Sequence, residues 1–100
     1  MANICSNKYY ISSDYKETID KIVSKLKDLK IDVEYIDDYS IEGFFDSMWD
    51  FPNYDFKDFF NEFTDDTIYM RCLSEEYSCG VVSMNVYSEG KWKDPQYFDF

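Results

Sequence analysis

Hydrophobic and polar positions alternate near the start of the chain and then follow a helical period. Residues 5–11 alternate along the chain, and their aromatic content is typical of a β-strand. Asp14 and Glu17 then stand at the spacing of a helix capping box. The apolar positions that follow are three or four residues apart, namely Ile19, Ile22, Val23, Leu26 and Leu29. The pattern predicts a strand and then an amphipathic helix, whose N-cap candidates are Ser12, Ser13 and Asp14.

The middle of the chain shows the same change of period. Residues 31–35 alternate and predict a short strand whose polar face is acidic. Apolar side chains between Ser40 and Pro52 stand at helical spacing, and these are Ile41, Phe44, Phe45, Met48 and Trp49. From Asn53 to about Asp66 the same spacing recurs at Phe56, Phe59, Phe60 and Phe63. These stretches predict a second and a third helix, whose rings we expect in the core.

Two β-branched and aromatic runs follow. Residues 67–73 and 81–87 are separated by a short polar stretch and predict an antiparallel hairpin. The tail 97–100 either forms a last edge strand or packs over the sheet, and the pattern leaves both open. The sequence therefore predicts an α+β fold in which an antiparallel sheet packs on three helices. Because no linker signal interrupts the chain, we expect a single domain over residues 1–100.

Composition restricts the chemistry that this fold can carry. The chain is 45% hydrophobic and 21% aromatic, which predicts a folded core rather than disorder. Its 21 acids and ten bases give a net charge of −11, so a charged partner is expected to be basic, and neither an anionic membrane nor a nucleic acid is expected as a ligand. There is no histidine, and the three cysteines form no C-x-x-C pair. We therefore expect no catalytic centre, no metal, no cofactor and a reducing, cytoplasmic location.

The excess of acids is concentrated in one part of the sequence. Residues 32–66 hold twelve acids and one base, Lys57, and so carry the entire net charge. On the two predicted helices these acids stand about one turn apart, where like charges destabilise a helix by about 0.2 to 0.5 kcal/mol per pair. Carboxylates spaced about 6 Å apart along a helix resemble the phosphates of a nucleic-acid strand. The predicted partner-binding residues are Asp37, Asp38, Glu42, Asp46, Asp50, Tyr54, Asp55, Asp58 and Glu62.

Three resemblances accompany this pattern. In size and acidity the chain resembles small phage proteins that inhibit host defence nucleases by imitating nucleic acid, including anti-CRISPR and anti-restriction proteins. Residues 46–50 are similar to the D-x-x-W-D stretch of the barstar family of intracellular ribonuclease inhibitors, which implies that Asp46 and Asp50 displace a phosphate. The parallel sheet of that family departs from the hairpin predicted here. Residues 2–7 resemble the opening of the YubB-like ferredoxin-like family, with Ile4 where that family usually has Trp.

The sequence thus predicts a non-enzymatic inhibitor that blocks the cationic groove of a nucleic-acid-binding enzyme, such as a defence nuclease. One alternative is a toxin immunity protein of the barstar kind. Another is a plasmid or phage adaptor whose acids only confer solubility and whose contact is the tail 97–100. A metal-dependent nuclease would instead need oxygen ligands such as Asp37 and Asp38, together with Lys57. The oligomeric state is not indicated.

Overall fold

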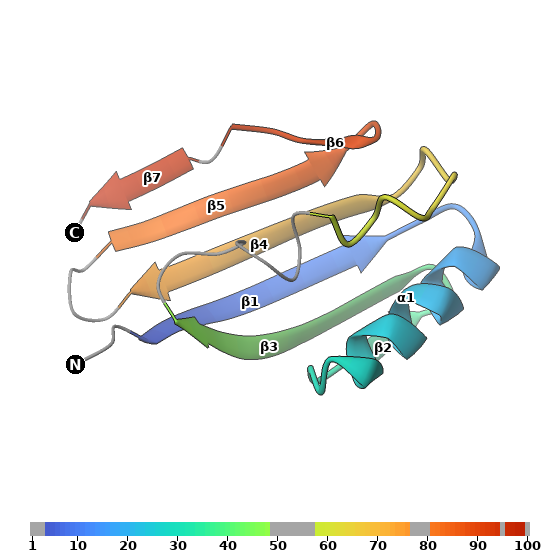
Figure 1. The fold of residues 1–100 in the computed structure, drawn as a ribbon, viewed down its shortest axis with the longest axis horizontal. Coiled ribbons are helices and arrows are strands. Elements are labelled where there is room, and N and C mark those ends of the chain that lie inside the picture. The colour runs from blue at the N-terminus through green and yellow to red at the C-terminus, as the bar shows by residue number, and fades with distance from the viewer. Residues whose placement is uncertain (1–3, 49–57, 77–80, 95, 100) are drawn as a thin grey trace.

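The computed structural model describes residues 4–48, 58–76, 81–94 and 96–99. In this part of the chain, seven antiparallel strands form one sheet, and one helix packs on it (Figure 1). The elements are β1 (Ile4–Ser12), α1 (Lys16–Asp28), β2 (Glu34–Asp37), β3 (Ser40–Met48), β4 (Tyr69–Glu76), β5 (Val81–Ser88), β6 (Lys91–Trp92) and β7 (Gln96–Asp99). The strand order is β2-β3-β1-β4-β5-β6, and β7 also pairs with β5. The predicted α+β class is confirmed, with one helix in the described part of the chain rather than three.

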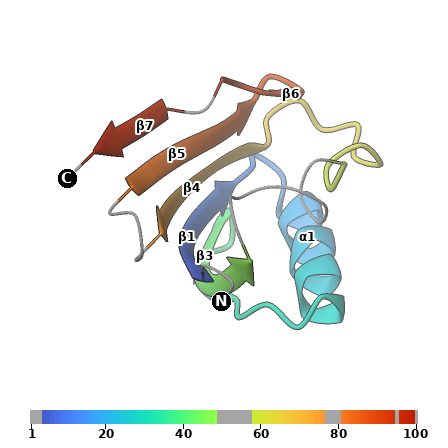
Figure 2. The ribbon, with the colours of Figure 1, turned by 60° about the vertical axis from the view of Figure 1, so that its left-hand side comes forward.

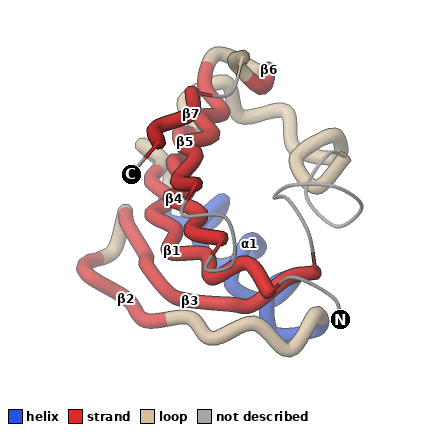
Figure 3. The backbone as a smooth tube through the Cα atoms, turned by 90° about the vertical axis from the view of Figure 1, so that its left-hand side faces the viewer, coloured by secondary structure: helices blue, strands red, loops and turns tan. Residues whose placement is uncertain are grey.

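The core lies between α1 and one face of the sheet, which we call the inner face. Figure 2 shows α1 on this side, and Figure 3 places the loop of residues 58–68 on the same side of β1, β4 and β5. The opposite face, which we call the open face, is covered by no helix of the described residues. The buried hydrophobic side chains are Tyr9, Ile11, Ile19, Ile22, Val23, Leu26, Ile41, Phe59, Phe60, Ile68, Met70, Cys72 and Tyr87.

The helix predicted between Ser40 and Pro52 is wrong, because residues 40–48 form strand β3. This strand pairs with β1 without a break from Ile4↔Met48 to Ser12↔Ser40. Ile41 is buried on the inner face, whereas Phe44 lies exposed on the open face. A short apolar run is compatible with both periods, so the long ladder with β1 decides the conformation.

The helix predicted from Asn53 to Asp66 is also wrong over its described part. Residues 58–62 form turns, with bonds from Asn61 N–H to the Asp58 carbonyl and from Phe63 N–H to the Phe60 carbonyl. The neighbouring rings of Phe59 and Phe60 are both buried. Residues 53–57 lie outside the described part of the chain.

The first helix is confirmed, but its predicted cap is wrong. Tyr15 is the N-cap residue of α1, and no side chain caps it. Asp14 instead donates its backbone N–H to the Thr67 hydroxyl (3.0 Å). The hydroxyl of Ser13 accepts the Tyr15 N–H (3.1 Å) and donates to the carboxylate of Asp65. The start of α1 is therefore held by a loop distant in sequence, which local spacing cannot indicate.

The strand predictions hold with shifted ends. The hairpin predicted at residues 67–73 and 81–87 is confirmed as β4 and β5, which pair antiparallel from Met70↔Tyr87 to Glu76↔Val81. The strand predicted at 31–35 begins later, as β2. The tail forms β7 on the edge beside β5, which resolves the alternative that the sequence left open.

Candidate interaction surface

The β2–β3 hairpin combines acids with exposed apolar side chains at one edge of the sheet. Residues 32–48 contain six acids and neither Lys nor Arg. Within them, four large apolar side chains are between 49% and 60% exposed, and these are Tyr35, Ile36, Tyr39 and Phe44. We call this surface the acid–aromatic edge and define it as Glu34, Tyr35, Ile36, Asp37, Asp38, Tyr39, Glu42, Phe44 and Asp46. Apolar side chains gathered on a surface are typical of interaction sites.

The tip of the hairpin is built by the carboxylate of Asp37. It accepts the backbone N–H of Tyr39 (2.8 Å) and the hydroxyl of Ser40 (2.9 Å). These two bonds, the Tyr39 one first, hold the pKa of Asp37 below its usual range. The Tyr39 carbonyl in turn accepts the Ser13 N–H (3.0 Å), which ties the tip to the end of β1. Asp38 and Tyr39 are thus presented on an ordered turn.

Two carboxylates face each other across the hairpin. Glu34 lies directly opposite Glu42 in the register of β2 and β3. Among the described residues, no Lys or Arg lies within ion-pair distance of either carboxylate. Like charges directly opposite in a sheet destabilise it, so this pair does not serve the stability of the fold.

An exposed ring lies between two further acids on the open face. Phe44 is 60% exposed, and alternation along β3 places Glu42 and Asp46 on the same face on either side of it. The ammonium of Lys8, opposite Phe44 on β1, lies 5.7 Å from its ring centroid. The ring is therefore accessible to a partner, with a carboxylate on either side of it along β3 and the Lys8 ammonium beside it on β1.

A short network holds β2 against α1. The Tyr35 hydroxyl donates to Asp20 (3.0 Å), and Asp20 also forms an ion pair with Lys16 (3.1 Å). The hydrogen bonds from Lys16 and Tyr35 hold the pKa of Asp20 below its usual range. Partial burial, followed by the bond to Asp20, raises the pKa of Tyr35. The edge therefore has a defined position relative to the core.

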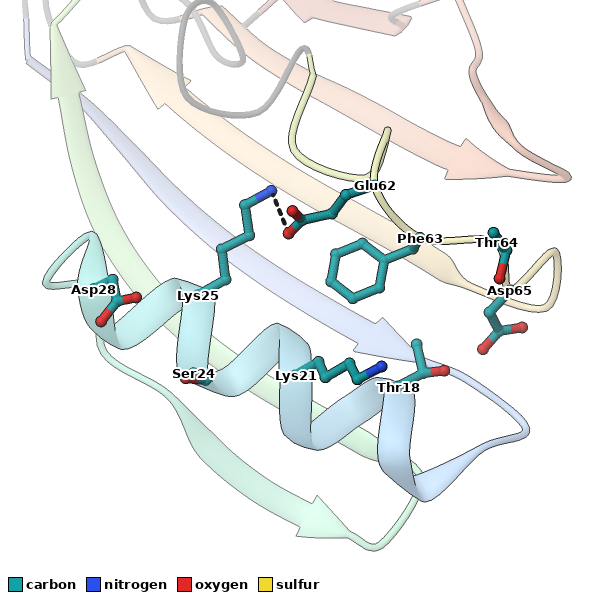
Figure 4. A pocket seen from close by; sticks show the side chains of 9 residues that line it. All are labelled: Thr18, Lys21, Ser24, Lys25, Asp28, Glu62, Phe63, Thr64 and Asp65. Atoms are coloured by element: carbon teal, nitrogen blue, oxygen red, sulfur yellow. Dashed lines mark ion pairs between the residues drawn. The ribbon is translucent and has the colours of Figure 1, made fainter.

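The structure separates the predicted partner-binding residues into two groups. Four of them belong to the acid–aromatic edge: Asp37, Asp38, Glu42 and Asp46. Asp58 and Glu62 lie instead in the turns beside α1, apart from the acid–aromatic edge. Glu62 pairs with Lys25 (3.1 Å), as Figure 4 shows. The remaining three, Asp50, Tyr54 and Asp55, lie outside the described residues.

The turns beside α1 border a groove of about 520 Å³ with mixed charge. Its walls carry Lys21 and Lys25 from α1 opposite Glu62 and Asp65 (Figure 4). Burial raises the pKa of Asp65, but hydrogen bonds from Ser13 and Thr67 outweigh it and leave the pKa below its usual range. These acids stabilise the loop and do not form a row of free charge.

The predicted partner-binding residues omit five members of the edge, namely Glu34, Tyr35, Ile36, Tyr39 and Phe44. Phe44 was assigned to a helical core stripe, and Ile36 to no site. The alternation of Glu42, Phe44 and Asp46 was the available signal, because acid, ring and acid at every second position would share one face of a strand. The helical spacing of Phe44 and Phe45 obscured it.

No metal centre or membrane span emerges from the described residues. They hold no group of three or more Cys, Asp or Glu arranged to bind a metal ion. Their one helix, α1, is too short and too polar to cross a bilayer.

Neither a protein-family model, nor a curated protein, nor a solved structure matches the chain. The resemblances to phage inhibitors, to the barstar family and to the YubB-like family thus stay predictions. Fold and surface together define a class, an α+β domain with a sheet covered on one side and an acidic, aromatic hairpin at its edge.

Proposed function

We propose that this protein is a non-enzymatic inhibitor whose acid–aromatic edge occupies the cationic groove of a nucleic-acid-binding enzyme in the cytoplasm. The observation that carries the proposal is the edge itself, where five acids and four exposed apolar side chains share one hairpin that has no Lys or Arg. A defence nuclease or a ribonuclease toxin is a partner of the required chemistry.

The edge supplies two separate contributions to such binding. Its charge attracts a basic partner over a Debye length of about 10 Å at moderate salt, which accelerates association. Its rings supply apolar area that a partner desolvates on contact. Glu42 and Asp46 are four residues apart on one strand, a distance of about 13 Å, with Phe44 between them. The two carboxylates supply separate negative charges, and the ring between them supplies a flat apolar surface.

The imitation rests on a strand and not on helices. Glu42 lies between β1 and β2, and Asp46 is paired with β1, so both carboxylates stand on hydrogen-bonded backbone. Rigid presentation lowers the entropy lost on binding. The acids beside α1 take no part in this mode, because they serve the loop.

The opposite edge of the sheet offers the competing contact surface. Tyr97 on β7 is 58% exposed, which fits the alternative in which the tail binds a partner and the acids only keep the protein in solution. That edge has no comparable concentration of charge, so binding through it would depend little on salt.

A capture experiment with charge-reversal variants tests the proposal. The edge variant carries Glu34→Lys, Asp38→Lys, Glu42→Lys and Asp46→Lys. The control variant has the same change of net charge at exposed acids elsewhere, namely Asp28→Lys, Asp66→Lys, Glu89→Lys and Asp94→Lys. Each protein is immobilised, exposed to host lysate at low salt and eluted with a salt ramp, and the eluate is challenged with duplex DNA and with RNA.

We expect the wild-type and control proteins to retain a basic protein that nucleic acid displaces, and the edge variant to lose it. Equal loss of capture in both variants would show that the net charge of the protein matters and the position of the acids does not. Retention of the basic protein by the edge variant would show that the contact lies on another surface. Deletion of residues 96–100 would then test whether that surface is the tail.

A further inference from the structure

The open face carries a cleft in which cations outnumber acids. It has a volume of about 280 Å³ and lies across β3, β1, β4 and β5, which are neighbours in Figure 1. We call it the open-face cleft, and its lining side chains are Lys8, Tyr10, Glu42, Arg71, Leu73 and Met84. Two cations and one acid leave it with a local positive charge, although the protein as a whole has a charge of −11.

Strand register brings these side chains together in two rows. Lys8 on β1 lies opposite Leu73 on β4, which lies opposite Met84 on β5. In the next row Tyr10 lies between Glu42 and Arg71. The first row supplies an apolar floor with a cation at one end, and the second supplies a ring between an acid and a second cation.

Arg71 is held in a geometry that leaves its donors available. Its guanidinium carbon lies 4.5 Å from the centroid of the Tyr10 ring. A guanidinium stacked on a ring uses its face for this contact, and its N–H groups point outward in its plane, where they bind a carboxylate through two parallel hydrogen bonds. Among the described residues, no carboxylate lies within ion-pair distance of Arg71 or Lys8.

The size and polarity of the cleft restrict its ligand. Its volume is below the roughly 300 to 1,000 Å³ of pockets for drug-sized ligands and cofactors, so it accommodates about one amino-acid side chain. Glu42 repels a ligand with two negative charges but accepts an N–H donor. The cleft therefore matches a group that combines one carboxylate, one apolar side chain and one amide N–H.

We propose that the open-face cleft binds the C-terminal residue of a polypeptide, with its carboxylate on Arg71 and Lys8, its apolar side chain on Leu73 and Met84, and its amide N–H directed to Glu42. This site is distinct from the contact proposed for the acid–aromatic edge, although Glu42 borders both and Lys8 also contacts Phe44 of the edge. A partner that presents a C-terminus here gains a second point of attachment beside the edge.

The test uses N-acetyl-phenylalanine as the probe, titrated into the isotopically labelled full chain and followed by NMR. We expect saturable shifts at the Arg71 side-chain N–H and at the backbone amides of Lys8, Tyr10 and Leu73. The primary amide of the same probe, which lacks the carboxylate, should bind at least about tenfold more weakly. Phenylacetate has the carboxylate but no amide N–H, and we expect it to bind more weakly than the N-acetyl amino acid.

Variants separate a local site from a general charge effect. Arg71→Gln should abolish the shifts, and Arg71→Lys, which keeps the charge but not the planar pair of donors, should weaken binding about fivefold or more. Lys27→Gln removes one positive charge from an exposed position on α1, on the inner side of the sheet, and should leave binding unchanged. Equal binding by Arg71→Gln and wild type, or equal binding of carboxylate and amide probes, would overturn the proposal.

Two further outcomes address the identity of the ligand and the independence of the two sites. Equal affinity for phenylacetate and the N-acetyl amino acid would overturn the assignment to a polypeptide in favour of a free organic acid. Glu34→Lys and Asp46→Lys weaken the edge without lining the cleft, so they should leave probe binding intact even where they abolish partner capture. Loss of probe binding in these two variants would contradict a separate cleft.

Discussion

Tyr9 and Gly43 face each other across the ladder of β1 and β3, and the Tyr9 hydroxyl occupies the space that a side chain at position 43 would need. The hydroxyl donates a hydrogen bond of 2.6 Å to the Asp32 carbonyl. A Cβ on Gly43 would lie 2.1 Å from that carbonyl oxygen and 2.6 Å from the Tyr9 hydroxyl. The segment that leads from α1 to β2 thus crosses β3 at the one position where no side chain obstructs it.

Gly43→Ala should therefore destabilise the fold. The obstructing atom is backbone, so the crossing segment must move, and overpacking of this kind costs about 1 to 3 kcal/mol. Tyr9→Phe removes only the hydrogen bond and should cost about 1 kcal/mol. Urea unfolding followed by tryptophan fluorescence compares the two. A free energy of unfolding for Gly43→Ala equal to that of wild type would contradict the close approach.

Tyr9 should make stability fall at alkaline pH. Burial, and then the nearby Asp32 and Cys72, raise the pKa of Tyr9 well above its usual value of about 10. Above pH 10 the unfolded chain loses a proton that the native Tyr9 retains, so the free energy of unfolding should decrease by up to about 1.4 kcal/mol per pH unit. Tyr9→Phe should reduce this slope. An unchanged slope in that variant would show that Tyr9 ionises freely in the native state.

Lys25 should stabilise the packing of the loop of residues 58–68 against α1. Its ammonium donates to the Phe59 carbonyl, pairs with Glu62 and lies 4.4 Å from the Phe59 ring centroid. Lys25→Met keeps most of the apolar stem and should lower the free energy of unfolding by about 1 to 2 kcal/mol. Lys21→Met, at an exposed position on the same groove, is the matched control and should change it little. Equal effects of the two substitutions would remove the special role of Lys25.

Asp65 should contribute to stability only above acidic pH. Its carboxylate accepts the Ser13 hydroxyl and the Thr67 backbone N–H (2.8 Å), and hydrogen bonding holds its pKa below the unfolded value of about 3.9. The contribution is complete above the unfolded pKa and disappears as pH falls through the lower native pKa. Asp65→Asn should thus be less stable than wild type at pH 7 and should approach it at pH 2 in urea titrations. A constant difference across this range would contradict the assignment.

Glu34→Lys should stabilise the protein while it weakens partner binding. The new ammonium would face Glu42 across the hairpin and replace repulsion by attraction, a gain of about 0.2 to 1 kcal/mol. The same change removes negative charge from the acid–aromatic edge. Thermal unfolding measures the first effect and the salt-ramp capture measures the second. If the variant is no more stable than wild type and captures the basic partner equally well, Glu34 has no role in binding.

Local sequence was informative where one period had no competitor. The amphipathic spacing from Ile19 to Leu26 could only be buried as a helix, and the β-branched run that ends at Tyr87 could only be a strand beside another. At Phe44 and Phe45 both periods fitted, and the choice passed to the partner strand β1. The cap prediction for α1 failed because contacts distant in sequence hold its candidates: Ser13 binds Asp65, 52 residues away, and Asp14 binds Thr67, 53 residues away.

The composition and the order of residues alone determined that the negative charge would be concentrated in the middle of the chain, and they predicted that a charged partner would be basic. The tertiary structure alone decided which acids share a surface. Pairing of β3 with β1 and β2 turned one side of the strand outward, so Glu42 and Asp46 joined Glu34 and the hairpin tip. Packing of the loop of residues 58–68 on α1 placed Glu62 in an ion pair with Lys25, away from that surface. Charge is a property of each residue, but a charged surface depends on which residues the backbone hydrogen bonds bring to the same face.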